Sequence, residues 1–123
     1  MKHQHNLCQR RKQFMNEINK KYSKYNDFRV SLRRICESLR FVKKNVARAR
    51  SWTLEHEQRA ELKNAIIGSI IDASYEIGVL RGKLEEWEQQ GFNVCGLARK
   101  LDGVQANVVH YRDNLRLLIQ EDL

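Results

Sequence analysis

Few residues of this chain have the types and spacing that metal or acid–base chemistry requires. His3, His5 and Cys8 lie close together near the N-terminus, but no fourth ligand of a zinc site accompanies them. Asp72 and Glu76 are one helical turn apart, yet no histidine stands beside them as in the Glu-x-x-His pairs of di-metal helical bundles. We therefore expect no metal, no cofactor and no small-molecule substrate.

The sequence patterns of common enzyme classes do not occur either. There is no glycine-rich phosphate loop, nucleophile elbow or zinc-finger spacing. Arg50 and His56 resemble the arginine–histidine pair of HEPN-type helical-bundle ribonucleases, which would imply RNA cleavage. The likeness consists of two common residue types across a helix boundary. The sequence thus predicts a protein that is not an enzyme.

Three cysteines, Cys8, Cys36 and Cys95, are an odd number at wide spacing. This spacing fits neither a disulfide framework nor a zinc module and favours reduced thiols in the cytoplasm. Cys36 lies beside an apolar helical stripe and is expected to pack in the core. No stretch approaches the roughly 18 apolar residues of a membrane span, and the polar N-terminus does not resemble a signal peptide. We expect a cytoplasmic protein that does not act at a membrane.

The distribution of charge is the strongest functional signal. The net charge is +8, and residues 1–52 hold fifteen basic residues against three acidic ones. The rest of the chain holds eight basic and twelve acidic residues, so pairing between the halves leaves a large positive excess. Such asymmetry is typical of proteins that bind a polyanion.

The basic residues form two groups. In the segment 26–52 they are Arg29, Arg33, Arg34, Arg40, Lys43, Lys44, Arg48 and Arg50. Within this group Arg33, Arg40, Lys44 and Arg48 follow one side of a helix for about 22 Å, a length that meets several nucleic-acid phosphates. Nearer the N-terminus lie Arg10, Arg11, Lys12, Lys20, Lys21 and Lys24, with Tyr22 and Tyr25 among them as candidate stacking groups.

The elements that must position these residues are helices. Apolar residues alternate in steps of four and three, in the second seam after its first step, which is the spacing of a heptad seam. The first seam, in residues 26–52, consists of Phe28, Leu32, Ile35, Leu39, Val42, Val46 and Ala49. The second, in residues 53–90, consists of Leu62, Ile66, Ile70, Ala73, Ile77, Leu80, Leu84 and Trp87. The third consists of Val94, Leu97, Leu101, Val104, Val108, Tyr111, Leu115 and Leu118.

Capping residues indicate where these helices begin and end. Asn26 or Asp27 is expected to cap the first helix, Thr53 the second, and Gly91 to stop the second. A shorter N-terminal stretch, a weaker helix or an arm, carries Leu7, Phe14, Ile18, Tyr22 and Tyr25. No segment sustains the period-two alternation of a strand. The predicted fold is all-α: an antiparallel helical bundle of three long helices plus a shorter basic N-terminal helix or arm.

The composition agrees with one small helical domain. A length of 123 residues fits a single domain over 1–123, with the basic N-terminal segment at 1–25 and the bundle core at 26–123. The chain has no proline, where average usage would give about six. This lack excludes collagen, proline-rich linkers and turn-dense β-sandwiches.

Part of the third helix resembles a helix-turn-helix, with a small residue, Ala98, in the first helix and a glycine, Gly103, near the turn. The apolar spacing passes through Gly103 without a change of phase, whereas a turn would normally reset it. We therefore predict one continuous helix.

The second helix has an apolar arc broader than one seam. Ile67, Ile71 and Tyr75 lie off the main stripe, and Gly78 accompanies them. This second face predicts a partner or homodimer interface.

Two functions fit the sequence. The first is a non-catalytic accessory or regulatory protein that binds nucleic acid, DNA or RNA, through its basic helix face. The alternative is a small inhibitor, immunity or adaptor protein that covers an acidic surface of a partner enzyme or complex.

Overall fold

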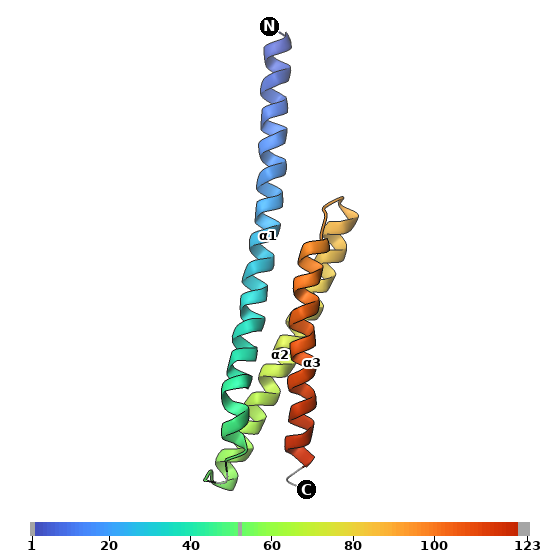
Figure 1. The fold of residues 1–123 in the computed structure, drawn as a ribbon. Helices are drawn as coiled ribbons and strands as arrows, with labels where there is room; N and C mark the ends of the chain where they lie inside the picture. Colours follow the sequence, from blue (N-terminus) through green and yellow to red (C-terminus); the bar gives the residue numbers. More distant parts are fainter. Residues whose placement is uncertain (1, 52, 121–123) are drawn as a thin grey trace. The chain divides into compact units, whose positions relative to one another are not determined.

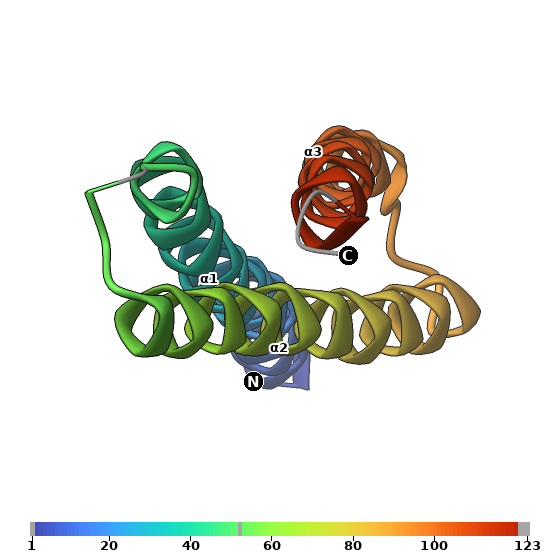
Figure 2. The same cartoon turned by 90° about the horizontal axis from the view of Figure 1, so that it is seen from below.

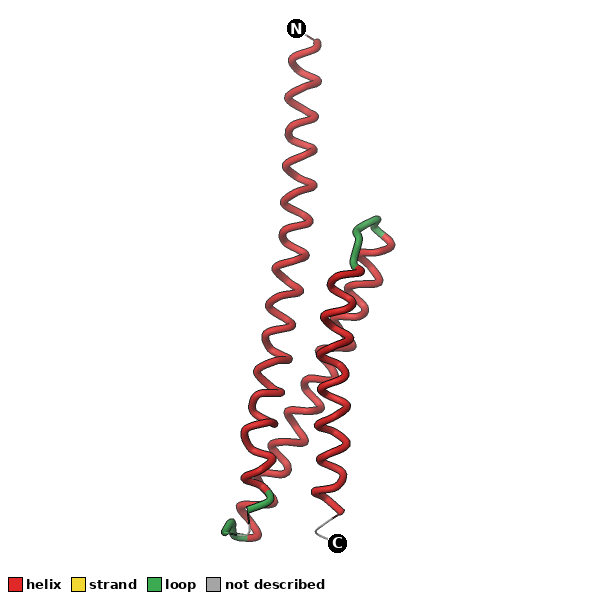
Figure 3. Tube along the Cα trace, in the orientation of Figure 1, coloured by secondary structure: helices red, strands yellow, loops and turns green. Residues whose placement is uncertain are grey.

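The computed structural model describes residues 2–51 and 53–120, and it gives the side chains of residues 8–51 and 53–116. The described backbone forms helix α1 (Lys2–Ala49), helix α2 (His56–Gln89) and helix α3 (Cys95–Gln120), as Figure 1 shows. Within these residues there is no strand (Figure 3). The prediction of an all-α fold is confirmed.

Helix α1 is one continuous helix. The predicted helix start at Asn26 or Asp27 is wrong, because the helix passes through both residues. Neither proline nor glycine occurs before Gly68, so nothing in the backbone interrupts the helix there. Asn26 and Asp27 are exposed, and a polar residue on the solvent side of a helix has the same sequence appearance as an N-cap. The chain divides into two compact units, Met1–Val30 and Ser31–Leu123.

Most positions of the three predicted seams are buried. In α1 these are Phe28, Ile35, Leu39, Val42 and Ala49. In α2 they are Ile66, Ile70, Ala73, Ile77, Leu80, Leu84 and Trp87, followed by Val94, and in α3 they are Leu101, Val108 and Leu115. The remaining described seam positions are half-buried, and the side chains of Leu7 and Leu118 lie outside the described residues. Burial of these apolar side chains is the main stabilising contribution, about 25 cal/mol per Å² removed from water.

Helices α2 and α3 pack against each other in the second unit (Figures 1 and 2). Arg81 of α2 binds two residues of α3: its Nη2 lies 2.6 Å from Asp102 Oδ1 and its Nε donates to Gln105 Oε1 at 3.1 Å. Helix α3 continues through Gly103 without a turn, which confirms the continuous helix and leaves no helix-turn-helix at this place.

The chain leaves α2 through a glycine in the left-handed region. Gly91 has φ of 92°, as the predicted stop at this residue requires. The Gly91 N–H donates to Glu88 O at 2.9 Å and the Phe92 N–H to Trp87 O at 3.0 Å. These two bonds are the Schellman motif, and they satisfy carbonyls at the helix end that would otherwise have no partner.

The start of α2 differs from the sequence prediction. Thr53 does not cap the helix, because its hydroxyl lies 2.7 Å from the Ser51 hydroxyl in the preceding turn. Glu55 is the N-cap instead, and its backbone N–H donates to Gln58 Oε1 at 3.4 Å. Arg59 secures this connection, since its Nη2 donates to the Ser51 carbonyl at 2.7 Å.

Two glycines give opposite predictions for the same substitution. A Cβ at Gly91 or at Gly103 meets no atom within 4 Å, so backbone conformation alone decides the effect. Gly91→Ala is expected to lower the free energy of unfolding by about 1–2 kcal/mol, because a Cβ is strained at positive φ. Gly103→Ala is expected to raise it by up to about 1 kcal/mol, since alanine favours a helix interior. Urea unfolding of both variants measures this difference, and equal effects would contradict the assigned helix end.

Candidate nucleic-acid interface

The basic face of the second unit consists of exposed side chains on α1. We define this face as Arg33, Arg34, Arg40, Lys43, Lys44 and Arg48, all of which are exposed. At 3.6 residues per turn, the side of α1 opposite the buried residues Ile35, Leu39 and Val42 carries Arg33, Arg40, Lys44 and Arg48. Arg34 and Lys43 lie at the two edges of that side. The helix therefore turns these charges to solvent. Arg50, in the turn after α1, is exposed as well.

Most cations of the basic face have no internal counter-charge. Arg34 is the exception, with its Nη1 4.0 Å from Glu76 Oε1 of α2. Among the described residues, the other five form no ion pair. Glu37 is the single acidic residue between positions 31 and 49, and it is exposed too. The positive charge of this face is therefore available to a ligand.

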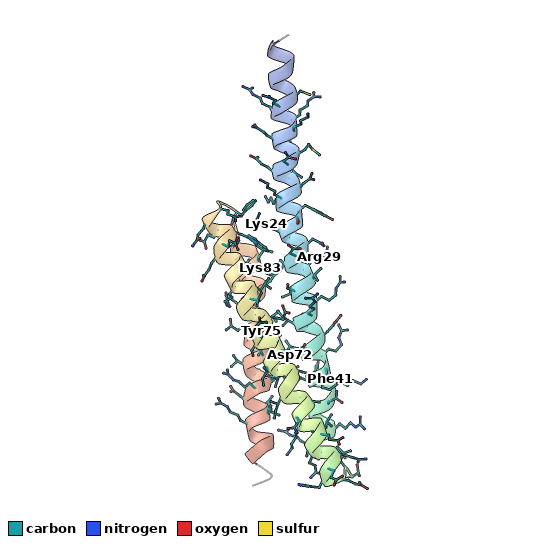
Figure 4. The ribbon with its side chains drawn as sticks, turned by 180° about the vertical axis from the view of Figure 1, so that it is seen from behind. Lys24, Arg29, Phe41, Asp72, Tyr75 and Lys83 are labelled. Atoms are coloured by element: carbon teal, nitrogen blue, oxygen red, sulfur yellow. The ribbon has the colours of Figure 1, made fainter. Side chains whose placement is uncertain are left out.

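The region also contains an exposed aromatic residue that was not predicted as a site residue. Phe41 lies off the apolar seam and is 38% exposed, next to Arg40 and one turn before Lys44 (Figure 4). The sequence does contain an indication of this exposure, because Phe41 is an aromatic residue outside the apolar seam and has cations on both sides in the sequence. Its position lets a planar group lie against the ring while the neighbouring cations contact phosphates.

The first unit has cations of its own. Arg10, Arg11, Lys12, Lys20, Lys21 and Arg29 are exposed, and Lys24 is half-buried. Tyr22 and Tyr25, the predicted stacking groups, are exposed as well, Tyr22 at 72%. The predicted basic residues therefore divide between the two units, with Arg29 and the N-terminal group in the first.

The predicted partner interface is an exposed apolar face on α2. Ile71 is 60% exposed and Tyr75 is 71% exposed, while Ile67 is half-buried. Gly78 is exposed, and a Cβ built on it would meet no atom within 4 Å. Figure 4 shows Tyr75 and Asp72 on the side of α2 turned to the viewer.

The thiols and carboxylates whose side chains the structure describes do not assemble into a metal site. Cys8, Cys36 and Cys95 are all exposed, so the prediction that Cys36 packs in the core is wrong. The reason is that Cys36 follows the fully buried Ile35 by one position, which turns it about 100° away from the core. In residues 8–51 and 53–116 no group of three His, Cys, Asp or Glu could hold a metal ion, and the side chains of His3 and His5 lie outside these ranges.

The carboxylates Asp72 and Glu76 do not act as a pair. Asp72 is exposed, whereas Glu76 lies beside Arg34. A shallow pocket at the start of α2 is lined by Arg48, Leu54, Gln58, Glu61, Leu62 and Ala65. Its lining holds three aliphatic side chains, one amide, one cation and one carboxylate, and no nucleophile or pair of acid–base groups converges there.

In the part of the chain that the structure describes, no helix has the length and apolarity needed to cross a membrane. Comparison of the sequence with models of protein families and with curated proteins, and of the fold with solved structures, found no match.

Proposed function

We propose that this protein is a cytoplasmic, non-catalytic accessory or regulatory protein that binds DNA or RNA through the basic face of α1. The architecture we propose is an antiparallel bundle of the three helices, in which residues 1–25 serve as a basic arm. The observation that supports the proposal is the row of exposed cations on α1 that form no ion pair with described residues. An ordinary solvated helix face mixes charges of both signs, whereas this face carries a single acidic residue, Glu37, among its cations.

The spacing of these cations suits a phosphate backbone. Arg33, Arg40 and Arg48 span about 22 Å of the helix, and duplex DNA presents a phosphate on each strand about every 3.4 Å. The planar guanidinium of arginine donates two parallel hydrogen bonds to phosphate oxygens, which strengthens each contact. Contacts of this kind position a protein on nucleic acid but read no sequence.

The experiment that tests the proposal is binding to duplex DNA, single-stranded DNA and RNA over a series of salt concentrations. Four phosphate contacts would give a slope of log K against log salt of about −3.6 on a duplex and about −2.8 on a single strand. Fluorescence anisotropy with labelled oligonucleotides measures both. A dissociation constant weaker than about 10⁻⁴ M for all three ligands at physiological salt would overturn the proposal.

A second candidate function is binding to an acidic surface of another protein, as an inhibitor, immunity or adaptor protein. It is favoured by the exposed apolar side chains Ile71 and Tyr75, which resemble the anchors of a protein interface. The same salt series separates the two candidates, because failure with all three nucleic acids would leave protein binding as the use of the basic face.

A further inference from the structure

The first half of α1 exposes an apolar stripe. It consists of Phe14, Ile18, Tyr22 and Tyr25, with Met15 beside it, and all five residues are exposed. Their spacing of four, four and three places them on one side of the helix. Phe14 is 63% exposed and Tyr22 is 72% exposed, which is unusual for such large rings. We call this surface the N-terminal stripe.

The charged residues around the N-terminal stripe are mostly basic. Between residues 8 and 27 there are six cations and two acidic residues, Glu17 and Asp27. Lys21 falls within the stripe itself, between Ile18 and Tyr25. Two copies of the stripe would place like charges together, so a partner surface must be apolar and acidic.

The outer face of α2 has this chemistry. Its apolar members are Ile67, Ile71, Tyr75 and Val79, of which the last three are exposed. The exposed charged residue within this span is Asp72, and the other exposed charged residues of α2 are also acidic: Glu57 and Glu61 before the span, and Glu85, Glu86 and Glu88 after it. The four cations of α2 are instead half-buried or buried: Arg59, Lys63, Arg81 and Lys83.

The outer face of α2 also leaves room for another helix. Gly78 and Gly82 are exposed, and a Cβ at either position would meet no atom within 4 Å. Small residues on an outer face allow the backbone of a second helix to approach closely.

We propose that the protein self-associates, with the N-terminal stripe of one copy packed on the outer face of α2 of a second copy. The two surfaces match in length, since residues 14–25 span about 17 Å and residues 67–79 span about 18 Å of helix. Lys21 lies near the middle of its stripe, and Asp72 lies at the edge of the α2 face, halfway along its length. We propose a reciprocal exchange, in which each copy places its stripe on α2 of the other, and such an exchange is a symmetric dimer.

Self-association does not rest on the proposed nucleic-acid function. It uses Phe14 to Tyr25 of the first unit and the outer face of α2, whereas the basic face lies on residues 33–48. The phosphate backbone offers nothing to cover Ile18 or Ile71, but another apolar helix face does. A second copy supplies both the apolar area and the opposite charge.

The test is the mass of the full-length protein by light scattering, without nucleic acid, over a range of concentrations in low salt. We expect a dimer with a dissociation constant on the order of 10 μM. Lys21→Glu and Asp72→Lys are each expected to weaken it by about tenfold or more, because each places like charges face to face. An equimolar mixture of the two variants is expected to restore the dimer, since both of its interfaces then pair opposite charges.

The matched control is Arg99→Glu mixed with Asp113→Lys, which changes the same charges on exposed residues of α3. These variants should dimerise like the parent. A monomer at concentrations up to about 1 mM would overturn the proposal. So would a dimer that neither Lys21→Glu nor Asp72→Lys weakens. The third contrary result is that both variants are weakened but their equimolar mixture does not regain the dimer. Helix content by circular dichroism shows whether each variant is folded. Because the light scattering is done without nucleic acid, its result is independent of the nucleic-acid titrations.

Discussion

The triple variant Arg33→Glu, Arg40→Glu, Lys44→Glu is expected to bind nucleic acid about 500-fold more weakly than the parent at 0.1 M salt. Each phosphate contact to a duplex releases about 0.9 of a counterion, which at this salt concentration is worth a factor of about eight. The loss of three contacts, each worth a factor of about eight, gives the expected loss of about 500-fold in affinity. The slope of log K against log salt should become shallower by about 2.7. Anisotropy titrations at four or five salt concentrations measure both quantities.

The matched control reverses three exposed arginines of α3. Arg99→Glu, Arg112→Glu and Arg116→Glu change the net charge by the same amount, but these residues belong to α3 and not to the basic face of α1. A loss below about tenfold is expected, because an effect of net charge alone is screened beyond a Debye length of about 10 Å at 0.1 M. If both triple variants lost affinity equally, α1 would not be the phosphate-binding surface.

The triple variant of the basic face should remain folded, so that a loss of binding can be attributed to the lost charges. Arg33, Arg40 and Lys44 are exposed and form no ion pair with any described residue. Substitutions at such positions usually change the free energy of unfolding by no more than about 0.5 kcal/mol.

The heptad spacing of apolar residues made the helices and their buried sides predictable from the sequence. The alternation of four and three steps identifies Ile35, Ile66 and Leu101 as core positions, and all three are fully buried. Helix boundaries were less predictable, because they depend on competition between local hydrogen bonds. Thr53 has the residue type of an N-cap, but its hydroxyl pairs with Ser51 and Glu55 takes that position.

The exposure of the basic face could also be predicted, since these cations lie between the seam positions. The sequence could not predict which of these cations has an acidic partner. The Arg34–Glu76 ion pair depends on the register of two helices that are distant in sequence. Phe41 was missed for a related reason: its exposure depends on how far the neighbouring helices cover α1, and the sequence does not encode that extent locally. The role of these residues in binding remains a prediction.

Leu80→Ala is expected to cost about 3 kcal/mol of unfolding free energy, a large effect on the fold. Leu80 is fully buried in the middle of α2, and truncation removes three methyl or methylene-sized groups while leaving a cavity that the neighbours fill only in part. A domain of this size has a total stability of about 5–15 kcal/mol, so the variant loses a substantial share. Guanidinium unfolding should show a lower midpoint with an unchanged slope.

Ile71→Ala on the same helix is the matched control, because Ile71 is 60% exposed in the single chain. In dilute protein, where the proposed dimer has dissociated, its cost should stay below about 1 kcal/mol, since the side chain contacts water before and after unfolding. In concentrated protein the cost should rise, because the dimer buries Ile71 and stabilises the folded state by mass action. Leu80→Ala should show no such dependence on concentration beyond that of the parent. A cost for Ile71→Ala that stays small at every concentration would contradict the use of the outer face of α2 in self-association, while the assignment of Leu80 to the core would stand.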